Sequence, residues 1–285
     1  IRRDQVDIQV YEDTNGVRSG EKCAFSGELL AVDLGPGILG SVLDGIGRPL
    51  KKLGEDGIFI RRGIHTGMLS HVWEMPFVPS VRVGDALHPG SFIGCSKEGA
   101  HVEHRIMVPP FSRGGIVEFI APEGRYPLDR TICRVSGGEE YALSQKWRVR
   151  VPRPVQERLP LDRPLITGQR ILDTLFPLAL GGAAVLPGGF GTGKTVTQQS
   201  LAKWCNADII VYIGCGERGN EMTEVLEEFP ELSDPWHDAP LMERLVLIAN
   251  TSNMPVAARE ASIYLGMTIA EYYRDMGYNV AIMAD

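Results

Sequence analysis

The sequence has few cysteines and none at a spacing typical of metal ligands. Its 285 residues include five, an odd number scattered along the chain: Cys23, Cys95, Cys133, Cys205 and Cys215. None forms a C-x-x-C pair, so neither a zinc ribbon nor a disulfide framework is indicated. The pattern favours reduced, partly buried thiols in a cytosolic protein.

Long apolar runs are missing as well. The longest uncharged run, Thr174 to Gly193, is interrupted by prolines and glycines, so it does not predict a membrane-spanning helix. No signal peptide is recognisable. The chain opens at Ile1 within a strand-like alternation and stops at Asp285, directly after an apolar run, so we expect a fragment of a longer protein.

An excess of positive charge is also lacking. Lys and Arg total 29 against 36 Asp and Glu, a formal net charge of -7. A chain that grips nucleic-acid phosphates is usually basic, so no nucleic-acid partner is expected. The 44% hydrophobic and 23% charged content is ordinary for globular proteins and disfavours disorder. At about 150 residues per domain, the length suggests about two domains.

The first half of the sequence predicts β structure. Val6–Val10 alternates apolar and polar residues like a half-buried strand, and turn signals follow at 14–16 and 34–37. We interpret residues 1–56 as the C-terminal part of a β-barrel with the start of a linker. Residues 57–150 have turn signals about every ten residues and predict a β-rich insert.

Two patterns inside the insert resemble functional sites. Residues 83–94 resemble the hairpin packing of biotinyl and lipoyl carriers, but the stretch 106–110, where the hairpin tip would lie, offers no lysine. Carrier activity is therefore disfavoured. His101-x-Glu103-His104 lacks a third metal ligand nearby, and we expect these side chains to be polar and to face solvent.

From about Leu165 onward the pattern alternates between strands and helices. Apolar strands are predicted at 183–186, 208–213, 245–249 and 280–284, and helices at 194–204, 221–229 and 255–276. This alternation predicts an α/β domain over residues 151–285, with a parallel sheet and right-handed crossovers. Ligands of such sheets bind at the carboxyl ends of the strands.

The strongest motif lies at the start of the first long helix. Residues 188–195 fit G-x-x-x-x-G-K-[ST], the P-loop that cradles phosphates. Glycines let backbone N–H groups converge on phosphate oxygens, and the helix dipole adds positive potential. Lys194 is predicted to contact the β- and γ-phosphates, and the Thr195 hydroxyl to bind Mg²⁺. The predicted nucleotide-binding residues are Gly188, Gly189, Phe190, Gly191, Thr192, Gly193, Lys194, Thr195 and Val196.

Charged residues follow two of the predicted strands. Glu217 could activate an attacking water, and Arg218 could neutralise charge on the γ-phosphate. Asp285 comes directly after an apolar strand, the position of an acid that holds Mg²⁺ through water. Arg259 and Glu260 fall in the first turn of the last helix, where we expect them only to pair locally.

Four segments together resemble the catalytic A subunits of V/A-type rotary ATPases. They are residues 164–170, the P-loop, 212–221 and 250–260, and the resemblance extends over nearly the whole chain. It implies a RecA-like P-loop domain, with Glu217 as catalytic carboxylate, Lys194 and Arg218 on the phosphates, and Thr195 and Asp285 at Mg²⁺. Gly189 departs from archaeal-type relatives, which often carry Pro there.

The resemblance also implies partners and a location. The subunit would alternate with non-catalytic B subunits in an A3B3 ring, and one of those B subunits would supply an arginine finger. Central and peripheral stalks would connect the ring to a membrane sector that moves protons or sodium ions. The complex would lie at the cytoplasmic face of a membrane. An inactive nucleotide-binding subunit and a RecA-like nucleic-acid motor remain the alternatives.

Overall fold

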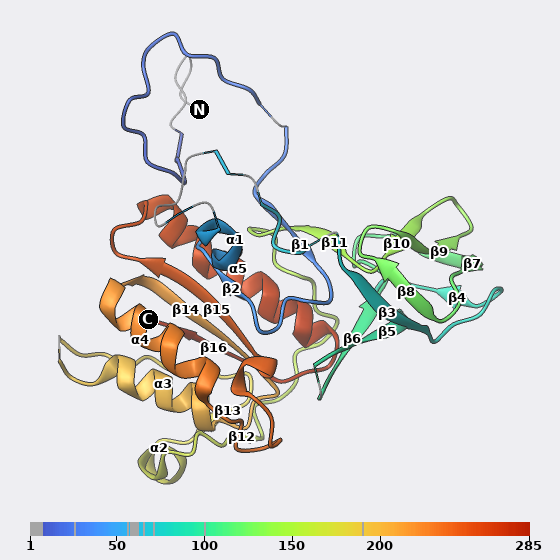
Figure 1. The fold of residues 1–285 in the computed structure, drawn as a ribbon. Coiled ribbons are helices and arrows are strands. Elements are labelled where there is room, and N and C mark those ends of the chain that lie inside the picture. Colours follow the sequence, from blue (N-terminus) through green and yellow to red (C-terminus); the bar gives the residue numbers. More distant parts are fainter. Residues whose placement is uncertain are drawn as a thin grey trace.

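The computed structural model describes residues 8–25, 27–55, 57, 63–64, 66–70, 72–99, 101–189 and 191–285. An α/β unit and a β-rich unit lie side by side (Figure 1). Within these ranges, no helix combines the length and apolar character needed to cross a membrane.

The α/β unit is built on a four-stranded parallel sheet. Its strands run in the order β16 (Val280–Ala284), β14 (Ile209–Glu217), β15 (Leu245–Thr251) and β2 (Val42–Leu43). The long strands β14 and β15 are nearly continuous apolar runs because both of their faces are covered. The predicted α/β class with a parallel sheet is confirmed.

Helices cover both faces of this sheet. Leu265 and Ile269 of α5 (Val256–Asp275) pack with Ile213 and Ile248 on one face. Ala202 of α3 (Lys194–Trp204) and Val225 of α4 (Gly219–Glu228) pack with Tyr212, Leu247 and their neighbours on the other. Alternate residues of each strand therefore belong to different core clusters, as the strand period of two requires.

The strand predicted at 183–186 does not form, and that prediction is wrong. Residues 182–189 have no regular structure, and Val185 is 85% exposed. A short apolar run becomes a strand only when a neighbouring strand pairs with it, and none of the described strands does so. The preceding segment instead forms β12 (Pro164–Leu165), α2 (Arg170–Leu175) and β13 (Leu178–Ala179), with the two strands antiparallel.

The insert consists of two four-stranded antiparallel sheets. One has the order β6 (Val102–Met107), β5 (Phe92–Glu98), β3 (Glu74–Pro79) and β8 (Gly124–Pro127). The other has the order β10 (Glu140–Ala142), β9 (Thr131–Val135), β7 (Gly115–Ile120) and β4 (Ala86–Leu87). Phe77, Ile93 and Ile132 are fully buried in its core, so the predicted β-rich insert is confirmed.

The segment before the insert joins both units. β1 (Ala31–Leu34) pairs antiparallel with β11 (Gln145–Arg148), which closes the stem of the insert, while β2 extends the parallel sheet. A short helix, α1 (Leu50–Gly54), follows.

The turn at Asn15–Gly16 forms, with Gly16 at φ 89°. Residues 8–10 are exposed and not strand, contrary to the prediction for Val6–Val10, whose first two residues lie outside the described part. Domain boundaries at 56 and 150 stay predictions.

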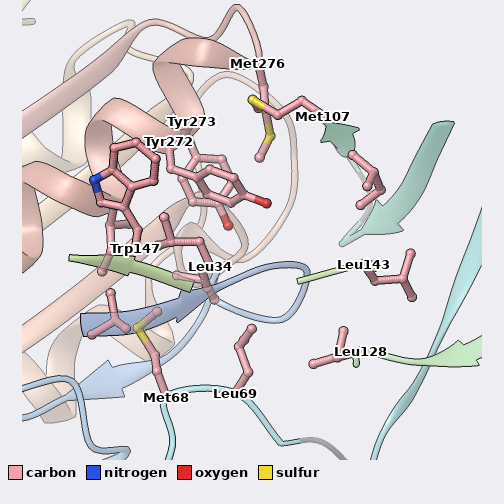
Figure 2. Packing of buried hydrophobic residues seen from close by; sticks show 14 of the residues in the cluster. Leu34, Met68, Leu69, Met107, Leu128, Leu143, Trp147, Tyr272, Tyr273 and Met276 are labelled. Carbon is pink, nitrogen blue, oxygen red and sulfur yellow. The ribbon is translucent and has the colours of Figure 1, made fainter. Parts of the chain in front are cut away.

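One apolar core runs from the insert into the α/β unit. Figure 2 shows Tyr272 and Tyr273, on α5, beside the strands that carry Leu34 and Trp147, with Met107 and Met276 close by. The insert is therefore packed against the helix that covers the parallel sheet.

A buried polar network lies within this junction. His104 is fully buried, contrary to the prediction that it faces solvent, whereas His101 and Glu103 are exposed. Its Nδ1 lies 2.6 Å from Oε2 of Glu98, and its Nε2 lies 2.9 Å from the Tyr272 hydroxyl. The prediction failed because no local pattern indicates that α5 covers this strand. Among the described residues, no group of three or more ligands suits a metal.

Candidate functional site

The carboxyl ends of the parallel strands bring two predicted acids to one edge of the sheet. Glu217 ends β14 opposite Thr251 of β15, and Asp285 follows β16. The Asp285 N–H donates to the Ile213 carbonyl at 2.9 Å, and the Cys215 N–H donates to the Asp285 carbonyl at 2.5 Å. The backbone of Asp285 therefore continues the strand ladder alongside the last residues of β14.

Glu217 lies among other carboxyl groups. Burial, a hydrogen bond shared with the Glu221 carboxyl, and the negative charge of Asp285 together raise the pKa of Glu217 to about 7. Oδ2 of Asp285 is buried and has no hydrogen-bond partner among the described residues. A buried carboxylate oxygen without a donor suits a bound cation, so the donor set fits the predicted Mg²⁺ role of Asp285.

A sharp bend in the backbone positions Glu217. Gly216 has φ +86°, and a Cβ there would lie only 2.5 Å from Nε of Arg259. Arg259 donates from Nη2 to the Ser252 carbonyl at 3.1 Å, and the Ser252 N–H donates to the Glu217 carbonyl at 2.8 Å. Arg259 thus braces the loop that carries Glu217.

The sequence reasoning missed this role of Arg259. Local pairing with Glu260 was expected, but Glu260 instead pairs with Arg150 at 3.1 Å. The signal available in the sequence was its position at the start of the helix that follows β15. Because the carboxyl ends of parallel strands share one edge, such a residue lies near the end of the next strand.

Arg218 lies at the start of α4, directly after Glu217. Its side chain is about half exposed, and Nη1 lies 3.9 Å from Oε1 of Glu221. An exposed guanidinium at the ligand edge of the sheet can turn toward an anion and bind it through several N–H groups.

The P-loop is an exposed turn that leads into α3. Gly191 and Gly193 have φ of 76° and 82°, values that favour glycine, and Gly193 is the residue before the first turn of the helix. The Lys194 ammonium donates to the Gly188 carbonyl at 2.7 Å, so it folds back across the loop. The Thr192 hydroxyl donates to the Gly189 carbonyl at 2.8 Å. Thr195 and Val196 lie in the first turn of α3, and Phe190 lies outside the described residues.

The first turn of α3 points toward the edge where β14 and β16 end. α3 stops at Trp204, five residues before β14 begins. Figure 1 shows the start of α3 and the C-terminus on the same side of the unit. Within the described residues, no hydrogen bond or ion pair joins Lys194 or Thr195 to Glu217 or Asp285.

A P-loop helix, a parallel sheet with acids at its carboxyl edge and a double-sheet insert define the class as a P-loop nucleotide-binding protein. Family models agree: the ATP synthase alpha/beta family nucleotide-binding domain matches residues 168–285. The alpha/beta subunit barrel-sandwich domain matches residues 67–150. The chain belongs to the ATP synthase alpha/beta family, which implies a nucleotide ligand.

Similar curated proteins come from an archaeon and a bacterium. The A subunit of the A-type ATP synthase of Methanoculleus marisnigri is 58% identical, and the V-type ATP synthase alpha chain of Halothermothrix orenii is 56% identical. Each alignment covers 100% of this chain and 49% of the relative, so the chain spans about half the length of these relatives.

Solved structures with the same fold include EscN, an assembled ATPase in complex with its central stalk EscO from the enteropathogenic E. coli type III secretion system. The TM-score is 0.54 and the identity 22%, over 96% of this chain and 45% of that one. A prototypical ATPase from the type III secretion system of pathogenic bacteria matches with a TM-score of 0.51 and 22% identity, over 90% of this chain and 47% of that one.

Proposed function

We propose that this chain is the nucleotide-binding part of a catalytic A subunit of a V/A-type ATPase or ATP synthase. The subunit couples ATP hydrolysis or synthesis to proton or sodium transport by rotation. The observation that carries this proposal is the convergence of Glu217 and Asp285 at the sheet edge toward which the P-loop helix opens.

The P-loop residues 188–196 bind the phosphates. In the structure the Gly188 carbonyl holds the Lys194 ammonium at 2.7 Å. A phosphate oxygen would replace that carbonyl, because a charged acceptor makes a stronger hydrogen bond with an ammonium group. The N–H groups at the start of α3 add to the attraction.

Glu217 and Arg218 serve the reaction itself. Glu217 orients the attacking water and accepts its proton, and Arg218 approaches the oxygens of the terminal phosphate. Thr195 and Asp285 would hold Mg²⁺, which when bound neutralises phosphate charge. Arg259 and Gly216 keep the Glu217 backbone in place through the Ser252 contacts.

The remaining parts of the site lie on partners. We infer an A3B3 ring in which a non-catalytic B subunit supplies an arginine finger in trans, with central and peripheral stalks and a membrane sector. Such a finger contributes about 10³ to 10⁵ in rate. The isolated chain is therefore expected to bind nucleotide but to hydrolyse it slowly. The complex lies at the cytoplasmic face of a membrane.

The same residues favour a catalytic subunit over an inactive one. An inactive nucleotide-binding subunit needs the P-loop but has no use for a carboxylate at position 217. A nucleic-acid motor is disfavoured by the net charge of -7.

Titration calorimetry of this chain with Mg-ATP tests the proposed binding site. We expect Lys194→Ala to weaken binding at least tenfold, because a charge-assisted contact to phosphate is lost. Lys203→Ala is the matched control, since Lys203 lies on the same helix and pairs with Glu228 at 2.9 Å, at the far end from the P-loop. Equal affinity of the Lys194→Ala variant and the parent would contradict the site.

A further inference from the structure

Three buried polar atoms without a hydrogen-bond partner lie in and beside the nucleotide site. They are the Tyr212 hydroxyl of β14, Oε1 of Gln198 on α3, and Oδ2 of Asp285. In the part of the chain that the structure describes, no group bonds to any of the three. Because an unpaired buried polar group destabilises a fold, each of these atoms needs an explanation.

The strand geometry places Tyr212 and Asp285 on one face of the sheet. Tyr212 lies opposite Met283 of β16, and both side chains belong to the same core cluster. Asp285 continues the strand ladder two residues after Met283, so its side chain points to that face as well. Burial raises the pKa of the Tyr212 hydroxyl, and the negative charge of Asp285 raises it further. Glu217 and Glu221 add smaller effects. The hydroxyl is therefore a protonated donor that feels the Asp285 carboxyl group.

Helix α3 brings Gln198 to the same face. Ala202 is fully buried in the core cluster that contains Tyr212. Residues four apart lie on one side of a helix, so Gln198 also faces the sheet, one turn nearer to the P-loop than Ala202. Its buried Oε1 adds a second acceptor beside Asp285.

The three atoms match the bonding capacity of a single water molecule. Tyr212 supplies one donor, and Gln198 and Asp285 supply one acceptor each. A water molecule can accept from the hydroxyl and donate to both acceptors, and buried water typically makes about three such bonds. A carboxylate has about four acceptor positions, so a bond from this water leaves Asp285 able to serve Mg²⁺.

We propose that Tyr212 and Gln198 are positioning residues for Asp285 and act through one shared, buried water molecule. The inference rests on the proposed function, which gives Asp285 its role at Mg²⁺. The water fixes the orientation of the Asp285 carboxyl group and ties it to the helix that carries the P-loop. The groups that hold the cation and those that hold the phosphates thereby keep their relative position.

The ATP affinity of the full-length subunit, measured by calorimetry with Mg²⁺ and with EDTA, tests this role. Tyr212→Phe removes the donor but keeps the ring against Phe229, with centroids 5.7 Å apart, so the variant is expected to fold. Its affinity in EDTA should equal that of the parent, whereas its affinity with Mg²⁺ should fall about three- to tenfold, the effect of losing one hydrogen bond. Gln198→Leu should behave in the same way. Tyr141→Phe is the matched control, because this buried tyrosine of the insert donates to Glu139 at 2.9 Å, and it should bind like the parent in both buffers.

A double variant separates this role from a merely structural one. In the Asp285→Ala background, Tyr212→Phe should change the Mg²⁺-dependent affinity less than twofold, because its effect passes through Asp285. An equal loss of affinity in EDTA and in Mg²⁺, or the full loss in the Asp285→Ala background, would overturn the proposal. Parental affinity of Tyr212→Phe beside a weakened Lys194→Ala variant would overturn this inference alone. Parental affinity of Lys194→Ala would overturn the proposed function as well.

Discussion

The guanidinium of Arg259 fills the space that a side chain at position 216 would need. A Cβ on Gly216 would lie 2.5 Å from Nε of Arg259, and the backbone there has φ +86°. The bend of Gly216 and the helix that carries Arg259 therefore fit together as one support for Glu217. Gly216 and Arg259 can therefore affect the reaction at Glu217 without contacting the nucleotide.

Gly216→Ala should disrupt this support. An alanine at this φ is strained, and its methyl group displaces Arg259, at a cost of about 1–3 kcal/mol in the free energy of unfolding. We also expect ATP turnover of the assembled full-length subunit to fall. Gly219→Ala is the control, because a Cβ at Gly219 meets nothing within 4 Å. Urea unfolding and turnover should distinguish the two, and equal behaviour would refute the bracing role.

Glu98→Gln should remove a contribution to the free energy of unfolding that depends on pH. Burial opposes ionisation of Glu98, but His104 and the N–H groups of Leu39 and Gly37 outweigh it, so the pKa lies below the ordinary value of 4.5. A lowered folded-state pKa stabilises the fold above pH 4.5, and that stability is lost as pH falls through the folded-state pKa.

Urea unfolding between pH 7 and pH 3 measures this contribution. At pH 7 the variant should be less stable by about 1–3 kcal/mol, because the hydrogen bonds that the Glu98 carboxylate accepts in the core are weakened or lost, and the difference should shrink on acidification. Glu103→Gln is the control, because that side chain is exposed on the neighbouring strand. A constant difference across this range would show that Glu98 does not titrate as described.

Gly266→Ala should loosen the contact between α5 and the sheet. A Cβ at Gly266 would lie 2.3 Å from Cδ1 of Ile213. Because the surrounding core is close-packed, the added methyl group would force neighbouring side chains to move. We expect a loss of about 1–3 kcal/mol in the free energy of unfolding. Gly54→Ala, whose Cβ would meet nothing within 4 Å, should cost little. Equal midpoints in thermal unfolding would argue against close packing of α5 on β14.

The sequence predicted well wherever long apolar runs fix a buried element. The helix at 194–204 and the strand at 280–284 have the predicted bounds, because glycine, polar residues and turns delimit them sharply. The acids after β14 and β16 follow from the rule that ligands bind at the carboxyl ends of parallel strands.

The predictions that failed concern residues whose environment depends on contacts with parts of the chain that are distant in sequence. The run 183–186 is as apolar as a strand but has no partner strand among the described residues. His104 is polar but is covered by the tyrosines of α5, more than 160 residues further along the chain. Arg259 has an acidic neighbour in sequence, Glu260, yet it contacts the backbone of the loop after β15. Each of these depends on tertiary contacts rather than on periodicity or composition.

The most direct test of the account is Glu217→Gln in the full-length subunit assembled with its partners. The substitution keeps the shape of the side chain but removes its ability to accept a proton, so Mg-ATP binding should persist while turnover falls at least a hundredfold. Glu224→Gln, on the exposed face of α4, should behave like the parent. Parental turnover in the Glu217→Gln enzyme would contradict the assignment of Glu217 as the catalytic carboxylate.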